Sequence, residues 1–171
     1  MAARKGLFQK YLNPIFIETG SLVGDGIQNA LDVGFNTVYS IELSQTLYDI
    51  CVKRFKDNDN VHLVLGDSSK VMGDLLKMIK EPVTFWLDGH DSGGVTARGE
   101  IESPLMQELD IISTHQIKNH TIIIDDLRCW TIENNGFDIS SIKDKILTIN
   151  PDYLFTFENG FVENDILIAM I

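Results

Sequence analysis

Short apolar runs that end in acidic residues recur along this chain and limit what it can fold into. Glu18 closes the run Ile-Phe-Ile, Asp88 follows Val-Thr-Phe-Trp-Leu, and Asp125 follows Thr-Ile-Ile-Ile. Continuous apolar runs of this length are typical of strands buried in a parallel sheet, and open α/β sheets bind ligands at the carboxyl ends of such strands. We therefore expect these acidic residues to belong to one site.

Longer amphipathic segments separate the apolar runs, which is the pattern of alternating strands and helices. Ser44 suits the N-cap of a helix, and Ser103 suits another, with Pro104 at the first helical position. The sequence predicts strands over residues 15–19, 37–41, 61–65, 83–87 and 121–124, and helices over residues 26–33, 44–55, 70–79, 104–115 and 139–147.

Two more strands are predicted at the end of the chain, over residues 153–157 and 165–171. The connection between them contains Asn159 and Gly160 and is too short for a helical crossover, so we expect an antiparallel pair at the sheet edge. The predicted fold is therefore α/β, with a Rossmann-like, seven-stranded and mostly parallel sheet flanked by helices. A C-terminal antiparallel hairpin completes it.

The length and composition indicate a single globular domain. The chain has 171 residues, 44% of them hydrophobic and 23% charged, which are ordinary values for one domain. We expect one domain over residues 1–171, with residues 1–13 as a solvated N-terminal arm. The sequence has no apolar run that could span a bilayer and no signal peptide pattern, so we expect a cytoplasmic protein without a membrane partner.

The charge balance and the cysteines exclude several function classes. The formal net charge of −11 would repel a phosphate backbone, so no nucleic-acid partner is expected, and a cationic cofactor or a neutral substrate fits better. Cys51 and Cys129 lie far apart without Cys-x-x-Cys spacing. This spacing argues against a structural zinc site and against a disulfide framework.

The turn after the first strand has the features of a ligand-binding turn. Its glycines would let the backbone approach a ligand, and Glu42, at the end of the second strand, could accept both hydroxyls of a ribose. A dinucleotide site would have Gly-x-Gly-x-x-Gly spacing, whereas here Glu18 and Asp25 would oppose a pyrophosphate. An acidic turn suits a ligand that carries an ammonium and a sulfonium group. The glycines of this turn are Gly20, Gly24 and Gly26.

Three aspartates at two adjacent strand ends predict a metal site. Two like charges about 4 Å apart repel by roughly 4 kcal/mol at an effective dielectric near 20, so Asp88, Asp125 and Asp126 need a cation if they converge. Oxygen ligands without cysteine favour Mg²⁺, with Mn²⁺ or Ca²⁺ as alternatives. A competing interpretation is that Asp125 and Asp126 form a turn and cap pair balanced by Arg128.

Taken in order, these motifs resemble those of class I S-adenosylmethionine-dependent methyltransferases. The segment Glu18-x-Gly20-x-x-x-Gly24-x-Gly26 is similar to a sequence motif of the metal-dependent O-methyltransferases of the catechol type. The pair Asp125-Asp126 is closer to the sugar O-methyltransferases such as macrocin O-methyltransferase. Two features depart from the catechol type. Asp91 stands where that type carries a lysine, and few residues precede the first strand to cover a substrate.

The resemblance implies a role for each motif. Glu18 and Gly20 would lie along the methionine part of S-adenosylmethionine, and Glu42 would hold the ribose. Asp67 with Ser68 would meet the adenine edge, unless Asp67 only caps the following helix. The full set of implied cofactor-binding residues is Glu18, Gly20, Ser21, Gly24, Asp25, Glu42, Leu43, Gly66, Asp67, Ser68 and Asp88.

For the reaction itself, the resemblance implies a metal bound by Asp88, Asp125 and Asp126, with His90 or Asp88 as the group that removes a proton. Trp130 either lines the substrate pocket or packs in the core. We therefore expect a magnesium-dependent O-methyltransferase acting on a small hydroxylated molecule, preferably a sugar or glycan. The alternatives are a non-catalytic module that binds S-adenosylmethionine and an NAD-dependent oxidoreductase. The assembly state stays open, with a homo-oligomer as one option.

Overall fold

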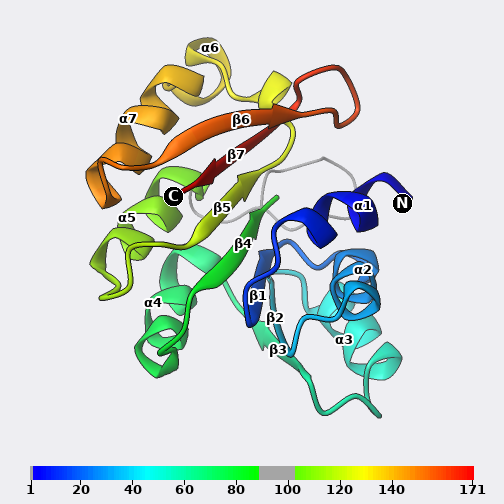
Figure 1. The fold of residues 1–171 in the computed structure, drawn as a ribbon. Helices are drawn as coiled ribbons and strands as arrows, with labels where there is room; N and C mark the ends of the chain where they lie inside the picture. Colours follow the sequence, from blue (N-terminus) through cyan, green and yellow to red (C-terminus); the bar gives the residue numbers. More distant parts are fainter. Residues whose placement is uncertain (1, 89–102) are drawn as a thin grey trace.

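A computed structural model describes residues 2–88 and 103–171, and Figure 1 shows their arrangement. The strands are β1 (Ile15–Thr19), β2 (Thr37–Glu42), β3 (Val61–Leu65), β4 (Val83–Leu87), β5 (Thr121–Ile124), β6 (Leu154–Glu158) and β7 (Ile166–Met170). The helices are α1 (Ala2–Lys10), α2 (Asp25–Val33), α3 (Gln45–Arg54), α4 (Ser68–Met78), α5 (Leu105–Thr114), α6 (Ile132–Asn135) and α7 (Ile139–Ile149), with a 3₁₀ turn η1 (Leu127–Cys129).

The seven strands form one sheet in the order β3-β2-β1-β4-β5-β7-β6. Strands β1 to β5 are parallel, while β7 pairs antiparallel with both β5 and β6. The predicted mostly parallel sheet with a C-terminal antiparallel hairpin is confirmed. In the observed register Thr19 lies beside both Ile41 and Leu87, and Leu87 lies beside Ile124. The carboxyl ends of β1, β2, β4 and β5 therefore share one edge.

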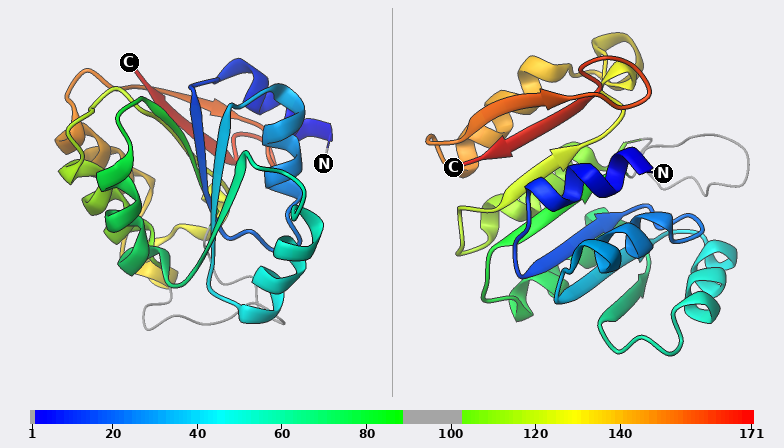
Figure 2. Two further views of the ribbon diagram at one scale, coloured as in Figure 1. Left: turned by 90° about the horizontal axis from the view of Figure 1, so that it is seen from below. Right: turned by 45° about the vertical axis from the view of Figure 1, so that its right-hand side comes forward.

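Helices cover both faces of the sheet. Figure 2 shows α1, α2 and α3 against one face and α4, α5 and α7 against the other. Phe8, Phe16 and Trp86 fill the first interface, where the rings of Phe8 and Trp86 meet edge to face with centroids 5.1 Å apart. The second interface contains the apolar side of β4 and β5 together with the inner faces of α5 and α7. Within the described ranges, no helix has the length and apolar character needed to cross a bilayer.

Three local features differ from the sequence predictions. Part of the expected N-terminal arm forms helix α1, because Leu7 and Phe8 are buried on the sheet. Helix α6 and the turn η1 were not predicted, since both are too short to show a helical period. Pro104, rather than Ser103, is the N-cap of α5. The other predicted N-cap, Ser44, accepts a hydrogen bond from the Leu47 N–H as expected.

Candidate cofactor and metal site

Glu18 is the penultimate residue of β1, and its side chain lies beside Gly26, which follows the turn. Its side chain is buried, and Oε1 accepts a hydrogen bond from Ser40 Oγ at 2.7 Å. Ser40 Oγ also lies 2.5 Å from the hydroxyl of Ser21, which is buried as well. The Glu18 carboxylate is therefore fixed by its neighbours on β2 and on the turn. It brings a negative charge to the carboxyl end of β1.

Packing as well as backbone conformation requires glycine in this turn. Gly24 has φ 86°, and a Cβ atom there would lie 2.5 Å from the ring of Phe55. A Cβ atom at Gly26 would lie 2.0 Å from Oε2 of Glu18. In dinucleotide-binding turns the glycines make room for a pyrophosphate. Here the space beside Gly26 is taken by a carboxylate of the chain itself.

We predict that Gly26→Ala weakens both folding and ligand binding, because the added methyl group must displace Glu18. Overpacking of this kind typically costs about 1–3 kcal/mol. Urea unfolding would measure the loss of stability, and calorimetry with S-adenosylhomocysteine the loss of affinity. The matched control is Gly73→Ala in α4, where the nearest atom, Cγ2 of Ile111, is 3.8 Å away. A Gly26→Ala protein as stable as the control would contradict this interpretation.

Glu42 at the end of β2 ties the β1 turn to the start of α3. Its Oε2 accepts the Leu22 N–H at 3.0 Å, and its Oε1 accepts the Ser44 N–H at 2.8 Å. Leu22 needs this support because its φ of 48° lies in the left-handed region. Each carboxylate oxygen keeps a second lone pair, so the buried Glu42 can still accept hydrogen bonds from a ligand.

The end of β3 supplies three more of the predicted cofactor residues. The Gly66 N–H donates to the carbonyl of Glu42 at 2.9 Å, which places the β3 turn beside the β2 end. Asp67 is the N-cap of α4 and accepts from the Ser69 N–H at 3.0 Å. Ser68 is buried and donates from Oγ to Glu108 of α5 at 2.5 Å. Capping accounts for Asp67, whereas Ser68 faces the interior between β1 and α5.

Asp88, Asp125 and Asp126 converge at the ends of β4 and β5. One carboxylate oxygen from each lies within 4.8 Å of the others. Asp125 is buried, Asp88 and Asp126 are half-buried, and the Asp126 N–H donates to Asp125 Oδ1 at 2.8 Å. Asp126 adopts φ 56°, a left-handed conformation that aspartate tolerates better than most residues. Three carboxylates at this spacing match the oxygen ligands that Mg²⁺ or Ca²⁺ prefers.

Arg128 and Asp165 form a clamp beside this cluster. Arg128 Nη1 lies 2.5 Å from Asp126 Oδ1 and forms a second ion pair with Asp165 Oδ2. The Asp165 carboxylate is fully buried and also accepts the N–H groups of Arg128 and Phe161, each at 3.1 Å. The clamp therefore joins the β6–β7 connection to the Asp126 side chain.

Asp165 was not predicted as a site residue, although the sequence holds a signal for it. Asp165 directly precedes the apolar run of β7. Because β7 runs antiparallel to β5, the amino end of β7 lies at the same edge as the carboxyl end of β5. An acidic residue before an antiparallel strand can thus join a cluster built from residues that follow parallel strands.

We predict that Asp165→Asn destabilises the fold by about 2–4 kcal/mol, because the Arg128 guanidinium loses a buried ionic partner and one acceptor oxygen becomes a donor. Urea unfolding followed by circular dichroism would measure this change. The control is Asp74→Asn, since the Asp74 side chain is 83% exposed and pairs with Lys77 at the surface, a pair worth little. Equal stability of the two variants would show that the clamp contributes nothing.

Comparisons with known proteins address the fold. No protein-family model matches the chain, and no curated protein matches its sequence. Its structure is similar to the methyltransferase PaMTH1 of Podospora anserina, solved with S-adenosylhomocysteine, with a TM-score of 0.67 and 10% identity over 97% of this chain and 75% of that one. The O-methyltransferase of Bacillus cereus, solved with the same ligand, gives a TM-score of 0.66 and 15% identity over 98% and 78% of the two chains.

A third neighbour is the O-methyltransferase TomG of Streptomyces achromogenes, solved with S-adenosylmethionine. It gives a TM-score of 0.66 and 8% identity, covering 98% of this chain and 77% of that one. This chain has the class I methyltransferase fold. Because the three sequence identities are only 10%, 15% and 8%, the structural similarity concerns the fold alone. Five of the predicted site residues lie at the shared carboxyl edge of the parallel strands, namely Glu18, Glu42, Asp88, Asp125 and Asp126.

Several predicted residues have other surroundings or cannot be placed. Asp25, the first residue of α2, forms an ion pair with Arg54 of α3 at 2.9 Å. Leu43 is half-buried directly after β2. Trp130 is buried, its ring stacks on Phe137, and its Nε1 donates to the carbonyl of Asp125 at 3.0 Å, so it packs behind the three aspartates. His90 lies outside the described residues.

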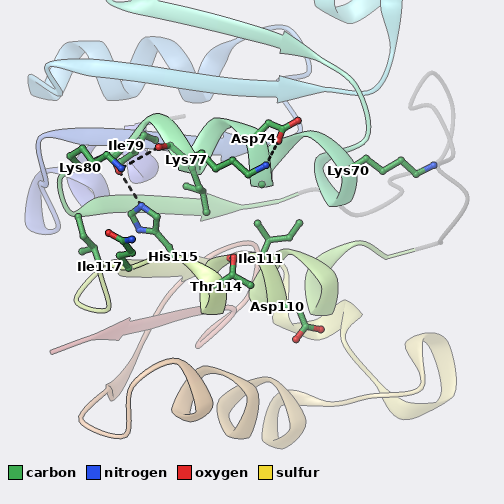
Figure 3. Close-up of a pocket in the computed structure, with 13 residues that line it drawn as sticks. Lys70, Asp74, Lys77, Ile79, Lys80, Asp110, Ile111, Thr114, His115 and Ile117 are labelled. Atoms are coloured by element: carbon green, nitrogen blue, oxygen red, sulfur yellow. Dashed lines mark hydrogen bonds and ion pairs between the residues drawn. The ribbon is translucent and has the colours of Figure 1, made fainter.

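A cavity of about 660 Å³ between α4 and α5 is lined by none of the predicted site residues that the structure describes (Figure 3). At one end, His120 Nδ1 accepts the Val83 N–H at 3.1 Å, so a neutral His120 donates from Nε2 to His115 Nδ1 at 2.9 Å. His115 Nε2 then donates to the carbonyl of Ile79 at 3.2 Å. Burial lowers the pKa of His120 to about 4, so the His120 ring serves as a neutral connector.

Proposed function

We propose that the chain is an S-adenosylmethionine-dependent O-methyltransferase that requires a divalent metal and methylates a small hydroxylated molecule. The observation that supports this most is the convergence of Asp88, Asp125 and Asp126 within 4.8 Å at the ends of β4 and β5, because β4 lies next to β1, the strand that carries Glu18. A metal site and a pocket for a positively charged cofactor would then share one edge of the sheet. The likeness to O-methyltransferases of the same fold agrees with this assignment.

The proposed cofactor site follows from the chemistry of its acceptors. Glu18 and Glu42 are buried carboxylates on neighbouring strands, and together they favour a ligand that carries positive charge. Glu42 would accept the ribose hydroxyls with the lone pairs that Leu22 and Ser44 leave open. Glu18 and Asp25 would oppose a pyrophosphate, which disfavours the NAD-dependent oxidoreductase.

The proposed metal site would be formed by all three aspartates. A divalent ion held there would lower the pKa of an acceptor hydroxyl and hold its oxygen toward the transferable methyl group. Asp88, at the end of β4, is the proposed proton acceptor among the described residues, because it is the half-buried member of the cluster that lies next to β1. We propose a sugar as the preferred acceptor on the basis of the Asp125-Asp126 pair.

Methyl transfer to a panel of sugars and phenols, measured with Mg²⁺ and with EDTA, tests the proposal. We expect transfer to a sugar hydroxyl that EDTA abolishes. Binding of S-adenosylhomocysteine without transfer to any acceptor would favour the non-catalytic binding module. Transfer that persists in EDTA would remove the metal from the proposal but leave the methyltransferase. Selective binding of a nicotinamide cofactor would contradict the proposal and favour an NAD-dependent oxidoreductase.

A further inference from the structure

A buried glutamate of α5 lies near the carboxyl edge of the sheet, on the face that α4, α5 and α7 cover. Glu108 is 1% exposed, and its Oε1 lies 2.5 Å from the hydroxyl of Ser68, one of the residues assigned to the adenine edge. The Thr19 hydroxyl, at the end of β1, lies beside the same carboxyl group and lowers its pKa, although Thr19 Oγ1 has no well-formed hydrogen bond. Glu108 thus contacts the ends of both β1 and β3.

Polar atoms without partners gather around the same region. Among the described residues, only three buried side-chain polar atoms lack a hydrogen bond, and they belong to Thr19, Ser103 and Gln107. Thr19 adjoins Glu108, while Ser103 precedes α5 and Gln107 lies in its first turn, next to Glu108 in sequence. Buried polar atoms rarely stay unpaired, so this region is suited to a polar ligand or to bound water.

The hydrogen-bond chemistry of the pair depends on the proton of Glu108. An ionised carboxylate only accepts, so the Ser68 hydroxyl must point its single hydrogen at Glu108. Ser68 Oγ then offers only lone pairs to a ligand, which suits an amino group. A protonated Glu108 can donate instead, and the Ser68 hydroxyl becomes free to donate to a ligand carbonyl.

We propose that Glu108 is a positioning residue that orients the Ser68 hydroxyl, so that the site selects the 6-amino group of adenine against the 6-carbonyl group of hypoxanthine. This inference rests on the proposed function, because it assumes that an adenosyl ligand occupies the edge formed by β1, β2 and β3. It adds to that function a source of base selectivity on a helix that carries none of the predicted site residues.

The charges around Glu108 allow this selectivity to vary near neutral pH. Burial raises the pKa of Glu108 to about 7, and the nearby Asp67 of the α4 N-cap acts in the same direction, while Ser68 and Thr19 lower it. Lys70 of α4 pairs with Asp67 at 3.9 Å, and Lys145 of α7 pairs with Asp110 on the outer side of α5. Glu108 is therefore ionised above about pH 7 and protonated below it.

The test compares the affinities of S-adenosylhomocysteine and its hypoxanthine analogue S-inosylhomocysteine by calorimetry, one pH unit on either side of the pKa of about 7. The two ligands share their amino acid part, so its own titration cancels in the ratio of affinities. In the wild-type chain we expect the preference for the adenosyl ligand to grow about tenfold from the lower to the higher pH, which is the size of one hydrogen bond.

Two variants separate positioning from support of the fold. Glu108→Gln keeps the size of the side chain but cannot ionise, and Ser68→Ala removes the oriented hydroxyl while leaving Glu108 in place. Both should bind the adenosyl ligand with a preference that no longer changes with pH. A wild-type preference independent of pH, or an unaltered pH dependence in either variant, would overturn the inference. If the wild-type chain binds neither ligand, the proposed function fails, and the inference about Glu108 fails with it.

Discussion

Asp126→Ala is expected to abolish metal-supported methyl transfer while leaving the affinity for S-adenosylhomocysteine nearly unchanged. Asp126 supplies one of the three carboxylates that converge at the ends of β4 and β5. Its removal leaves two ligands and frees Arg128 from one of its two ionic partners. Loss of a direct ligand should exceed the 10- to 100-fold effect of disturbing the groups around a metal, so we expect Mn²⁺ affinity to fall by about 100-fold or more.

Calorimetry with Mn²⁺ and with S-adenosylhomocysteine, on the same preparation, measures both expectations. Asp74→Ala serves as the control, because it removes one negative charge from an exposed position on α4 and should leave both affinities within about twofold. A large loss of S-adenosylhomocysteine affinity in Asp126→Ala would show that this carboxylate belongs to the cofactor pocket. Unchanged Mn²⁺ affinity would show that the three aspartates do not form the metal site.

The strand ends could be predicted from the sequence because local pattern and global position agree there. Buried parallel strands have continuous apolar runs, and the residue after each run lies at the ligand-binding edge. This rule is enough to locate Glu18, Glu42 and Asp88, and Asp125 and Asp126 follow from the same reasoning. The antiparallel final pair follows from the length of its connection alone.

The remaining site features depend on contacts that have no local signature. Glu108 lies on an amphipathic helix, and its burial follows from how α5 packs on α4, with Ser68 forty positions earlier as its partner. Asp165 comes to lie beside the three aspartates, paired with Arg128, only because the hairpin reverses the direction of β7. The role of Gly26 could not be predicted from the sequence either. A glycine in such a turn suggests that a ligand approaches the backbone closely, but in the structure the missing Cβ of Gly26 makes room for the side chain of Glu18.

Glu42→Ala is expected to have the opposite effect to Asp126→Ala, with lost cofactor binding and a preserved metal site. Hydrogen bonds to a charged acceptor contribute about 1.5–3 kcal/mol each, so losing two ribose contacts should weaken S-adenosylhomocysteine binding by about 100-fold or more. The variant also leaves the N–H groups of Leu22 and Ser44 without their acceptor, which loosens the left-handed turn at Leu22. Calorimetry with S-adenosylhomocysteine measures the loss.

The Mn²⁺ affinity of the same variant separates a lost contact from a lost fold. Asp88, Asp125 and Asp126 directly follow β4 and β5, which lie on the other side of β1 from β2, and a folded sheet keeps the three side chains together. Glu81→Ala, an exposed glutamate before the amino end of β4, controls for the charge removed. Loss of both affinities in Glu42→Ala would mean that this carboxylate supports the whole edge of the sheet. S-adenosylhomocysteine affinity within about threefold of the wild-type value would remove Glu42 from the cofactor site, because no other carboxylate follows β2 directly.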